Sequence, residues 1–269
     1  MQNVSLKELL EAGCHFGHKV ERWHPKAATF IYAAKEGVHI IDLAKTKSAL
    51  ESVLAYVEEL GKTGKALLFV GTKRQAKGVV TEAAKSAGIF YLTNRWVGGF
   101  LTNHEEVKKN IEKLNRMKKE SADGSWNQFP KHERVQLEKE TRKMERIYGG
   151  VTALMGVPSA IYIVDIKKEA SAVREAKRKN IPIIAIVDTN TDPTSVDYPV
   201  PANDDAVGSI KYITEKIAGV YGEGRKMGEK GKEEGVEKTK PSDVINAVPE
   251  EKEKVEEKPK KKGRPKKKV

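Results

Sequence analysis

Residues 66–76 read ALLFVGTKRQA, five apolar residues followed by a glycine and a polar, basic segment. An apolar run of this length is typical of a strand buried on both faces of a parallel sheet. Gly71 permits a tight turn after the strand, and the pattern predicts a helix from about Arg74 to Ser86 that ends at Gly88. A second short strand is predicted over residues 90–92. This unit of strand, turn, helix and strand is typical of an α/β fold.

The same alternation of apolar strands and helical patterns continues on both sides of that unit. The further predicted elements are a hairpin of residues 29–32 and 38–41, helices over residues 44–60, 170–179 and 205–220, and strands over residues 160–164 and 181–187. Short strands separated by helices indicate a parallel sheet that is covered on both faces. With right-handed crossovers, the sequence predicts a doubly wound sandwich of the Rossmann-like or flavodoxin-like kind.

One insertion interrupts this pattern. The interval from Leu92 to Ala160 is too long for an ordinary crossover between parallel strands. Asn103 and Glu106 have the spacing of a capping box, and the helix after them carries its apolar residues on one narrow stripe. A break at residues 123–125 separates it from a second helix of the same kind. We therefore expect an antiparallel helical hairpin of coiled-coil type that protrudes from the domain.

The C-terminal segment differs in composition from the rest of the chain. It is rich in Lys and Glu and lacks aromatic residues and apolar periodicity, so we expect a disordered, charged tail. Its last part, Lys258–Val269, contains basic residues and no acidic ones, which is typical of a solvated tail or a polyanion-binding arm. The predicted boundaries are residues 1–102 and 149–221 for the sandwich domain, 103–148 for the hairpin and 222–269 for the tail.

The composition favours a polyanionic partner. With 50 Lys and Arg against 38 Asp and Glu, the formal net charge is +12. Cys14 is the single cysteine, so no internal disulfide is possible and a reducing compartment fits. We expect no signal peptide, because charged residues interrupt the first apolar stretch. No apolar run approaches the roughly 20 residues of a membrane span, so we expect a cytoplasmic protein without a membrane partner.

A group of Cys and His residues lies near the N-terminus. Residues 14–18 read CHFGH, and Trp23 and His24 follow. A zinc site is one interpretation, but structural zinc ligands are more often separated by a short spacer than adjacent, and no second cluster completes the set. The neighbouring cations and Trp23 favour RNA contact instead, because aromatic rings stack on bases and cations contact phosphates.

Two glycine-containing turns are candidate binding loops. The turn at Gly71 lies in the natural crevice of a doubly wound sheet, where a helix N-terminus could hold an anion. It matches neither the Walker pattern nor the dinucleotide pattern, so an RNA phosphate or an unoccupied structural turn is favoured over a nucleotide. The second loop, residues 94–103, places paired glycines beside Arg95 and Trp96. It could contact RNA or serve as a hinge before the arm.

Acidic residues follow the last predicted strand. Asp188 and Asp192, with Asn203-Asp204-Asp205 later, could hold magnesium at the carboxyl ends of parallel strands. Asp and Asn also favour turns and helix caps for local reasons, and we favour that interpretation. We therefore predict no metal, no cofactor and no catalytic residues.

Several stretches resemble a known family. They are residues 12–18 (AGCHFGH), 23–26 (WHPK), 40–43 (IIDL), 70–73 (VGTK), 93–99 (TNRWVGG) and 181–192 (IPIIAIVDTNTD). As a set spread in order over about residues 5–218, they resemble the family of the second protein of the bacterial small ribosomal subunit. The resemblance implies a Rossmann-like domain with a coiled-coil arm, in contact with ribosomal RNA between the head and body of the subunit. It also implies help in recruiting the protein "S-one", which captures messenger RNA.

From these observations we expect a structural RNA-binding protein without catalytic turnover, small-molecule substrate or homo-oligomeric assembled state. Its partners would be small-subunit ribosomal RNA and neighbouring ribosomal proteins, including "S-one". A DNA-binding architectural protein is the alternative, because residues 262–266 (KGRPK) resemble an AT-hook. The predicted RNA-binding residues are Lys19, Arg22, Trp23, Lys26, Lys73, Arg74, Arg95 and Trp96, with Lys108, Lys109, Lys113, Arg116, Lys118 and Lys119 on the arm.

Overall fold

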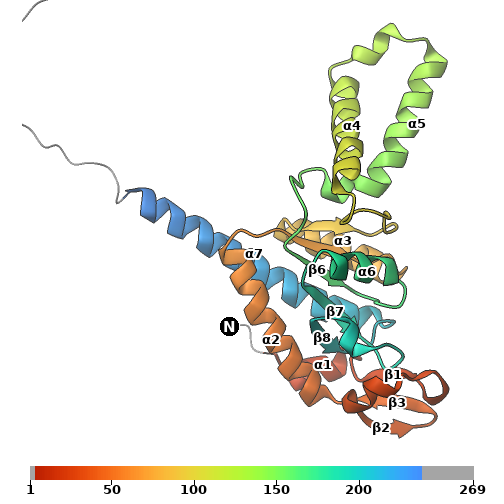
Figure 1. The fold of residues 1–269 in the computed structure, drawn as a ribbon, viewed down its shortest axis with the longest axis vertical. Coiled ribbons are helices and arrows are strands. Elements are labelled where there is room, and N and C mark those ends of the chain that lie inside the picture. The colour runs from red at the N-terminus through yellow and green to blue at the C-terminus, as the bar shows by residue number, and fades with distance from the viewer. Residues whose placement is uncertain (1–3, 238–269) are drawn as a thin grey trace, which may run out of the picture.

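A five-stranded parallel sheet forms the centre of the molecule (Figure 1). The structure is a computed structural model that describes residues 4–237, with side chains to residue 229. The strands are β4 (Leu67–Val70), β5 (Phe90–Leu92), β6 (Ala160–Ile163), β7 (Ile183–Val187) and β8 (Tyr198–Pro201). Their order is β5-β4-β6-β7-β8, and all four pairings are parallel. This order is the flavodoxin-like one, so the predicted α/β class with a parallel sheet is confirmed.

Strand β8 was not predicted, and its sequence explains why. It contains Pro199 and Pro201, which have no backbone N–H group. An interior strand needs such groups to form hydrogen bonds with the strands on both of its sides. The strand lies at the edge of the sheet and pairs with β7 alone, and prolines are tolerated at an edge. The sheet is thus one strand wider than the sequence pattern indicated.

Helices cover both faces of the sheet. Helices α2 (Leu43–Lys62), α3 (Ala76–Ala87) and α7 (Val207–Glu237) pack on the face that carries Phe69 and Tyr162. Helix α6 (Ala170–Arg178) and the segment around Phe100 and Leu101 cover the opposite face. Alternate strand residues therefore enter two separate apolar clusters, and all residues of β4 and β6 are buried.

Helix α7 is longer than predicted, because its glycines pack against α2. A Cβ atom on Gly224 would lie 2.6 Å from the carbonyl oxygen of Glu58, and one on Gly61 would lie 2.6 Å from that of Tyr221. These glycines let the two helix backbones approach closely. The predicted helix end near Val220 is wrong, because the helix continues to Glu237 through a segment that lacks apolar periodicity. The rest of the predicted tail lies outside the described residues.

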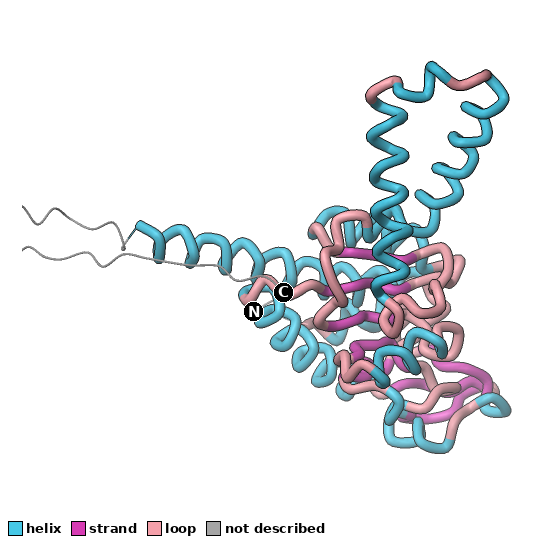
Figure 2. The backbone as a smooth tube through the Cα atoms, turned by 45° about the horizontal axis from the view of Figure 1, so that its top comes forward, coloured by secondary structure: helices cyan, strands magenta, loops and turns pink. Residues whose placement is uncertain are grey.

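Two antiparallel helices, α4 (His104–Ala122) and α5 (Lys131–Tyr148), project from the sandwich between β5 and β6 (Figures 1 and 2). The predicted stripe of α4 is buried, but Tyr148 is the one buried residue of α5. Coiled-coil packing of the pair therefore remains a prediction. Asn103 is the N-cap residue of α4 as predicted, but the predicted capping box is wrong, since the side chain of Asn103 makes no capping hydrogen bond.

A smaller antiparallel sheet lies beside the sandwich and begins after helix α1 (Leu6–Glu11). It consists of β1 (Phe16–Lys19), β3 (Val38–Ile41) and β2 (Ile31–Lys35), in that order. The predicted hairpin is present, and its turn has positive φ angles at Glu36 (53°) and Gly37 (78°), as two-residue hairpin loops require. Within residues 4–237, no helix combines the length and apolar character needed to cross a bilayer.

We call the close contact of Gly61 in α2 with Gly224 in α7 the glycine crossing. It predicts that alanine, which usually favours a helix, destabilises the protein here. We expect Gly224→Ala to lower the free energy of unfolding by about 1–3 kcal/mol, because the new methyl group meets backbone atoms of α2. Gly78→Ala in α3 is the matched control, since nothing lies within 4 Å of its Cβ position. It should be neutral or stabilising by up to about 1 kcal/mol. Urea denaturation measures both, and equal stability of Gly224→Ala and the wild type would refute tight packing at this crossing.

Candidate functional site

The carboxyl ends of the parallel strands bring acidic side chains around one lysine. Lys73 follows β4, and its Nζ lies 3.4 Å from Asp165, 2.9 Å from Asp204 and 2.7 Å from Asp205. These carboxylates come from the segments after β6 and β8. The order of the strands reverses between β4 and β6, which is where ligands bind in doubly wound folds. Here the position is occupied by an internal ion-pair cluster.

Several carboxylates lie close together in this cluster, and their charges shift the pKa values of Asp204 and Lys73. Burial and the charges of Asp165 and Asp188 raise the pKa of Asp204 to about 7, although Lys73 acts in the opposite direction. Burial alone would lower the pKa of Lys73, but Asp205 and Asp204 raise it well above its ordinary value. Lys73 therefore stays protonated, with its charge compensated inside the protein. The geometry disfavours an RNA phosphate at this turn, as well as the less favoured nucleotide, because either would face several carboxylates. It favours the other interpretation of the sequence, an unoccupied structural turn.

The turn at Gly71 has a packing role in the structure. A Cβ atom at this position would lie 2.9 Å from Cγ2 of Val80 and 3.4 Å from Cγ2 of Val164. The glycine therefore lets the chain leave β4 beneath helix α3. Its presence does not require a bound anion.

His18 joins the acidic cluster from the small sheet. Its Nδ1 lies 3.0 Å from Oδ1 of Asp188, and its Nε2 lies 3.4 Å from Oδ2 of Asp205. The close carboxylate of Asp188 raises the pKa of His18 against the lowering effect of burial. One ligand atom each from His18, Asp188 and Asp204 lie within 4.8 Å of one another, a donor set that could hold a divalent transition-metal ion.

The other members of the N-terminal Cys and His group point elsewhere. Cys14 is part of the apolar core, where burial raises its pKa. His24 accepts a hydrogen bond from the backbone N–H of Lys26 at 3.3 Å. The structure therefore does not bring Cys14 and His24 together with His18, and the zinc set considered from the sequence is not assembled.

Trp96 and its loop are fixed by a residue that the sequence analysis missed. Glu175 of α6 accepts hydrogen bonds from Nε1 of Trp96 at 3.0 Å, the N–H of Gly99 at 2.8 Å and the N–H of Leu101 at 3.1 Å. The ring of Trp96 lies 5.4 Å from that of Phe100. Burial would raise the pKa of Glu175, but these donors lower it below its ordinary value. Trp96 thus anchors the loop, and the only signal for Glu175 was an acid on the inner side of an amphipathic helix.

The predicted cations do not form one continuous site. Lys19, Arg22, Arg74 and Arg95 are exposed and, within residues 4–229, make no ion pair. Lys26 differs, because its Nζ lies 2.7 Å from Asp192 and 3.0 Å from Oγ1 of Thr194. The exposed Trp23 lies with its ring 5.7 Å from that of His39.

Most of the predicted arm cations are paired. Lys113 contacts Glu140 at 2.5 Å and Lys118 contacts Glu145 at 2.6 Å, so these two pairs join α4 to α5. Within α4, Lys108 pairs with Glu112, Lys109 with Glu106 and Arg116 with Glu120. In the part of the chain that the structure describes, Lys119 makes no such pair. Five of the six predicted arm cations are therefore held by carboxylates of the arm itself.

The two-sided sandwich and the projecting helix pair have a counterpart among known proteins. The family model described as ribosomal protein S2 matches residues 9–224, which include both parts. The chain belongs to the ribosomal protein S2 family. This membership confirms the resemblance noted in the sequence.

Two curated relatives of the ribosomal protein S2 family carry the name small ribosomal subunit protein uS2. The one from Desulfatibacillum aliphaticivorans is 45% identical over 227 residues, which cover 84% of this chain and 77% of the relative. The one from Geotalea uraniireducens (strain Rf4) is 44% identical over 224 residues, which cover 83% and 88%. Membership of a ribosomal protein family confirms the predictions of a structural, non-enzymatic protein and of a location on the cytoplasmic ribosome.

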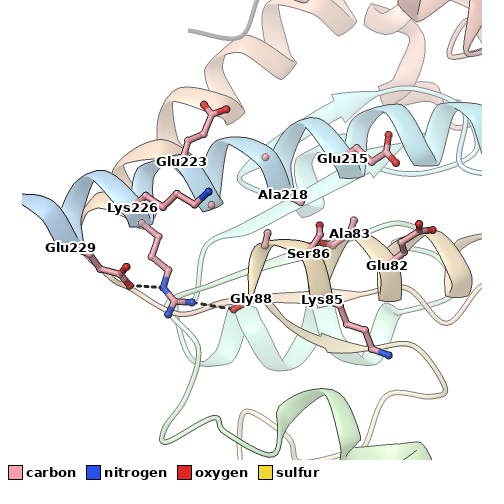
Figure 3. Close-up of a pocket in the computed structure, with 14 residues that line it drawn as sticks. Glu82, Ala83, Lys85, Ser86, Gly88, Glu215, Ala218, Glu223, Lys226 and Glu229 are labelled. Carbon is pink, nitrogen blue, oxygen red and sulfur yellow. Dashed lines mark hydrogen bonds and ion pairs between the residues drawn. The ribbon is translucent and has the colours of Figure 1, made fainter.

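A hollow of about 860 Å³ lies between α3 and α7, outside the regions described above (Figure 3). Small residues such as Ala83, Ala218 and Gly222 line it, with charged side chains around them. Arg225 crosses one end, where its Nε lies 3.2 Å from Glu229 and its Nη1 donates to the carbonyl oxygen of Gly88 at 3.4 Å. None of the residues that line this hollow is His, Cys or Asp.

The anchor role of Glu175 predicts a stability loss. We expect Glu175→Gln to lower the free energy of unfolding at pH 7 by about 2 kcal/mol, because several N–H donors lose a charged acceptor. The loss should shrink as the pH falls below the ordinary Glu value of 4.5, since the folded pKa lies lower still. Arg174→Gln on the exposed side of α6 is the control. A variant as stable as the wild type at pH 7 would contradict the assignment.

The raised pKa of Asp204 predicts a pH dependence. Between its ordinary 3.8 and about 7, the folded state binds a proton that the unfolded state has released. The contribution of Asp204 to stability therefore declines as the pH rises through this window, by at most about 1.4 kcal/mol per pH unit. Asp204→Asn should flatten the curve, measured by denaturation in the presence of a chelator. Parallel curves for wild type and variant would show that Asp204 titrates normally.

Proposed function

We propose that this protein is a structural component of the small ribosomal subunit and binds the ribosomal RNA of that subunit. Its membership of the ribosomal protein S2 family carries the proposal, because the relatives are named small ribosomal subunit proteins. The net charge of +12 supports it, since cations on a protein displace the counterions of RNA. Binding by this mechanism is electrostatic and depends little on base sequence.

Among the cations predicted from the sequence, those that are exposed and without ion pairs are the best candidates for phosphate contact. Lys19 and Arg22 lie beside Trp23, whose aromatic ring is 42% exposed and could stack on an unpaired base. Arg74 and Arg95 are exposed in the segments that follow β4 and β5. Paired cations contribute less, since RNA has to compete with the carboxylates that hold them. We therefore propose weaker roles for Lys26, Lys73 and the paired arm residues.

The proposal includes contact with neighbouring ribosomal proteins, among them the messenger-RNA-binding protein "S-one". An apolar hollow of about 470 Å³ lies where α1 meets the small sheet. Leu6, Leu10 and Tyr32 line it and are 47%, 52% and 77% exposed. A cluster of exposed apolar side chains is typical of a protein contact surface.

We propose that one copy of the protein occupies each subunit.

The alternative of a DNA-binding architectural protein gains no support from the family membership. Its motif at residues 262–266 lies outside the described residues. The acidic cluster around Lys73 also weakens the alternative of a nucleotide-binding enzyme, because it would repel phosphates.

Sedimentation of the tagged full-length chain in a cell lysate tests the proposal. The protein should migrate with small subunits at low salt. The double variant Lys19→Gln, Arg22→Gln should bind isolated small-subunit RNA with a salt dependence reduced by about 0.9 per lost contact in the slope of log K against log salt. The double variant Lys47→Gln, Lys211→Gln is the control, because both lysines are paired within their helices. Wild-type protein that sediments free of ribosomal particles would refute the proposal.

A further inference from the structure

The outer surface of α6 carries a group of cations that the sequence analysis did not single out. Arg174, Lys177 and Arg178 lie on the helix, and Lys179 follows its last residue. Lys167 and Lys168 precede the helix. All six side chains are exposed. We call this surface the α6 cationic face.

No carboxylate of the same segment shares this face. Glu169 is 4% exposed and accepts hydrogen bonds from the N–H group and the hydroxyl of Thr72. Glu175 is occupied by the Trp96 loop. Asp165 accepts from the N–H groups of Lys167 and Lys168 at 2.9 Å and lies 3.4 Å from Lys73. The acids of this segment therefore serve the interior, while its bases face solvent.

The cations of this face are also unpaired. Throughout the described side chains, none of the six makes an ion pair; Lys168 donates to the carbonyl oxygen of Thr72 at 3.3 Å, and Arg174 donates to Oγ of Ser171 at 3.2 Å. The arm provides the contrast, because there Lys113 and Lys118 contact carboxylates at 2.5 and 2.6 Å. Unpaired cations offer a polyanion their full charge, with no internal ion pair to break first.

Two neighbouring loops extend the face. The hydrogen bonds from Trp96 and Gly99 to Glu175 hold the loop that contains Arg95 against α6. The contact of Lys168 with Thr72 brings the segment that contains Arg74 to the other end of α6. Arg74 and Arg95 are exposed and, in the described part of the chain, unpaired. Two arginines predicted from sequence thus flank the cations of α6.

We propose that the α6 cationic face is the principal phosphate-binding surface of this protein and that it takes the sugar–phosphate backbone of double-helical ribosomal RNA. The inference rests on the proposed function and adds the surface and the form of the RNA. The exposed positions of α6 are Ala170, Ser171, Arg174, Lys177 and Arg178, with no aromatic ring to stack on a splayed base. They also lack the large apolar side chains that a membrane-surface helix inserts into lipid.

A matched pair of triple variants of the full-length chain tests this inference. The first is Arg174→Gln, Lys177→Gln, Arg178→Gln, and the second is Lys108→Gln, Lys109→Gln, Lys113→Gln. Both remove three charges from exposed helix positions, but the second set is ion-paired in the free protein. Binding to isolated small-subunit RNA is measured over a series of salt concentrations, and circular dichroism verifies folding of each variant.

The α6 variant should reduce the magnitude of the negative slope of log K against log salt by about 2.7, which corresponds to about 0.9 for each of three contacts. The arm variant should change it by less than half as much. The α6 variant should also lose more affinity for an unrelated RNA duplex than for single-stranded poly(U) or for vesicles of anionic lipid. Preferential loss of poly(U) or vesicle binding would overturn the choice of duplex backbone.

The two levels of the proposal fail in different ways. Wild-type protein that does not bind small-subunit RNA at any salt concentration refutes the proposed function. Wild-type protein that binds, with an α6 variant that matches it or with an arm variant that loses more, refutes the α6 cationic face while the proposed function stands.

Discussion

Burial of the central strands on both faces is the constraint on which the rest of the structure depends. The side chains of β4 and β6 enter two apolar clusters, and the strand interior has no room for a charge. Charged residues are therefore confined to the strand ends and to the outer sides of the helices. In a chain that is 33% charged, this separation decides where any ligand can be recognised.

The strand ends and the outer side of α6 differ in the sign of their charge. At the carboxyl ends of the strands, acids outnumber bases, so Lys73 and His18 serve to compensate buried carboxylates. On the outside, α6 presents bases whose acidic neighbours have turned inward. The crevice that many doubly wound proteins use for a nucleotide is thus internally neutralised, and the recognition of a polyanion moves to a helix surface.

The sequence was informative where the pattern is local. The run before Gly71 identified the buried strand, and Gly88 correctly ended α3 with a left-handed φ of 65°. It was misleading where a distant contact decides the outcome. The lack of apolar periodicity after Val220 suggested a tail, although glycines there allow helix contact with α2, and the prolines of β8 concealed a strand that only an edge position tolerates. For the site, residue type suggested Arg74 and Arg95 as candidates, which stay predictions. It could not reveal that carboxylates enclose Lys73 or that Glu175 holds Trp96.

The glycine crossing also has a consequence for the order in which the protein acquires its structure. Gly61 and Gly224 meet although 163 residues separate them in the chain (224 − 61). At about 5–20 residues per second, synthesis takes roughly 8–33 s to pass from the first to the second. Until α7 is made, the core residues that pack against it lack this cover on the nascent polypeptide. Completion of the domain is therefore a late, non-local event, and apolar surface that stays exposed until then favours aggregation.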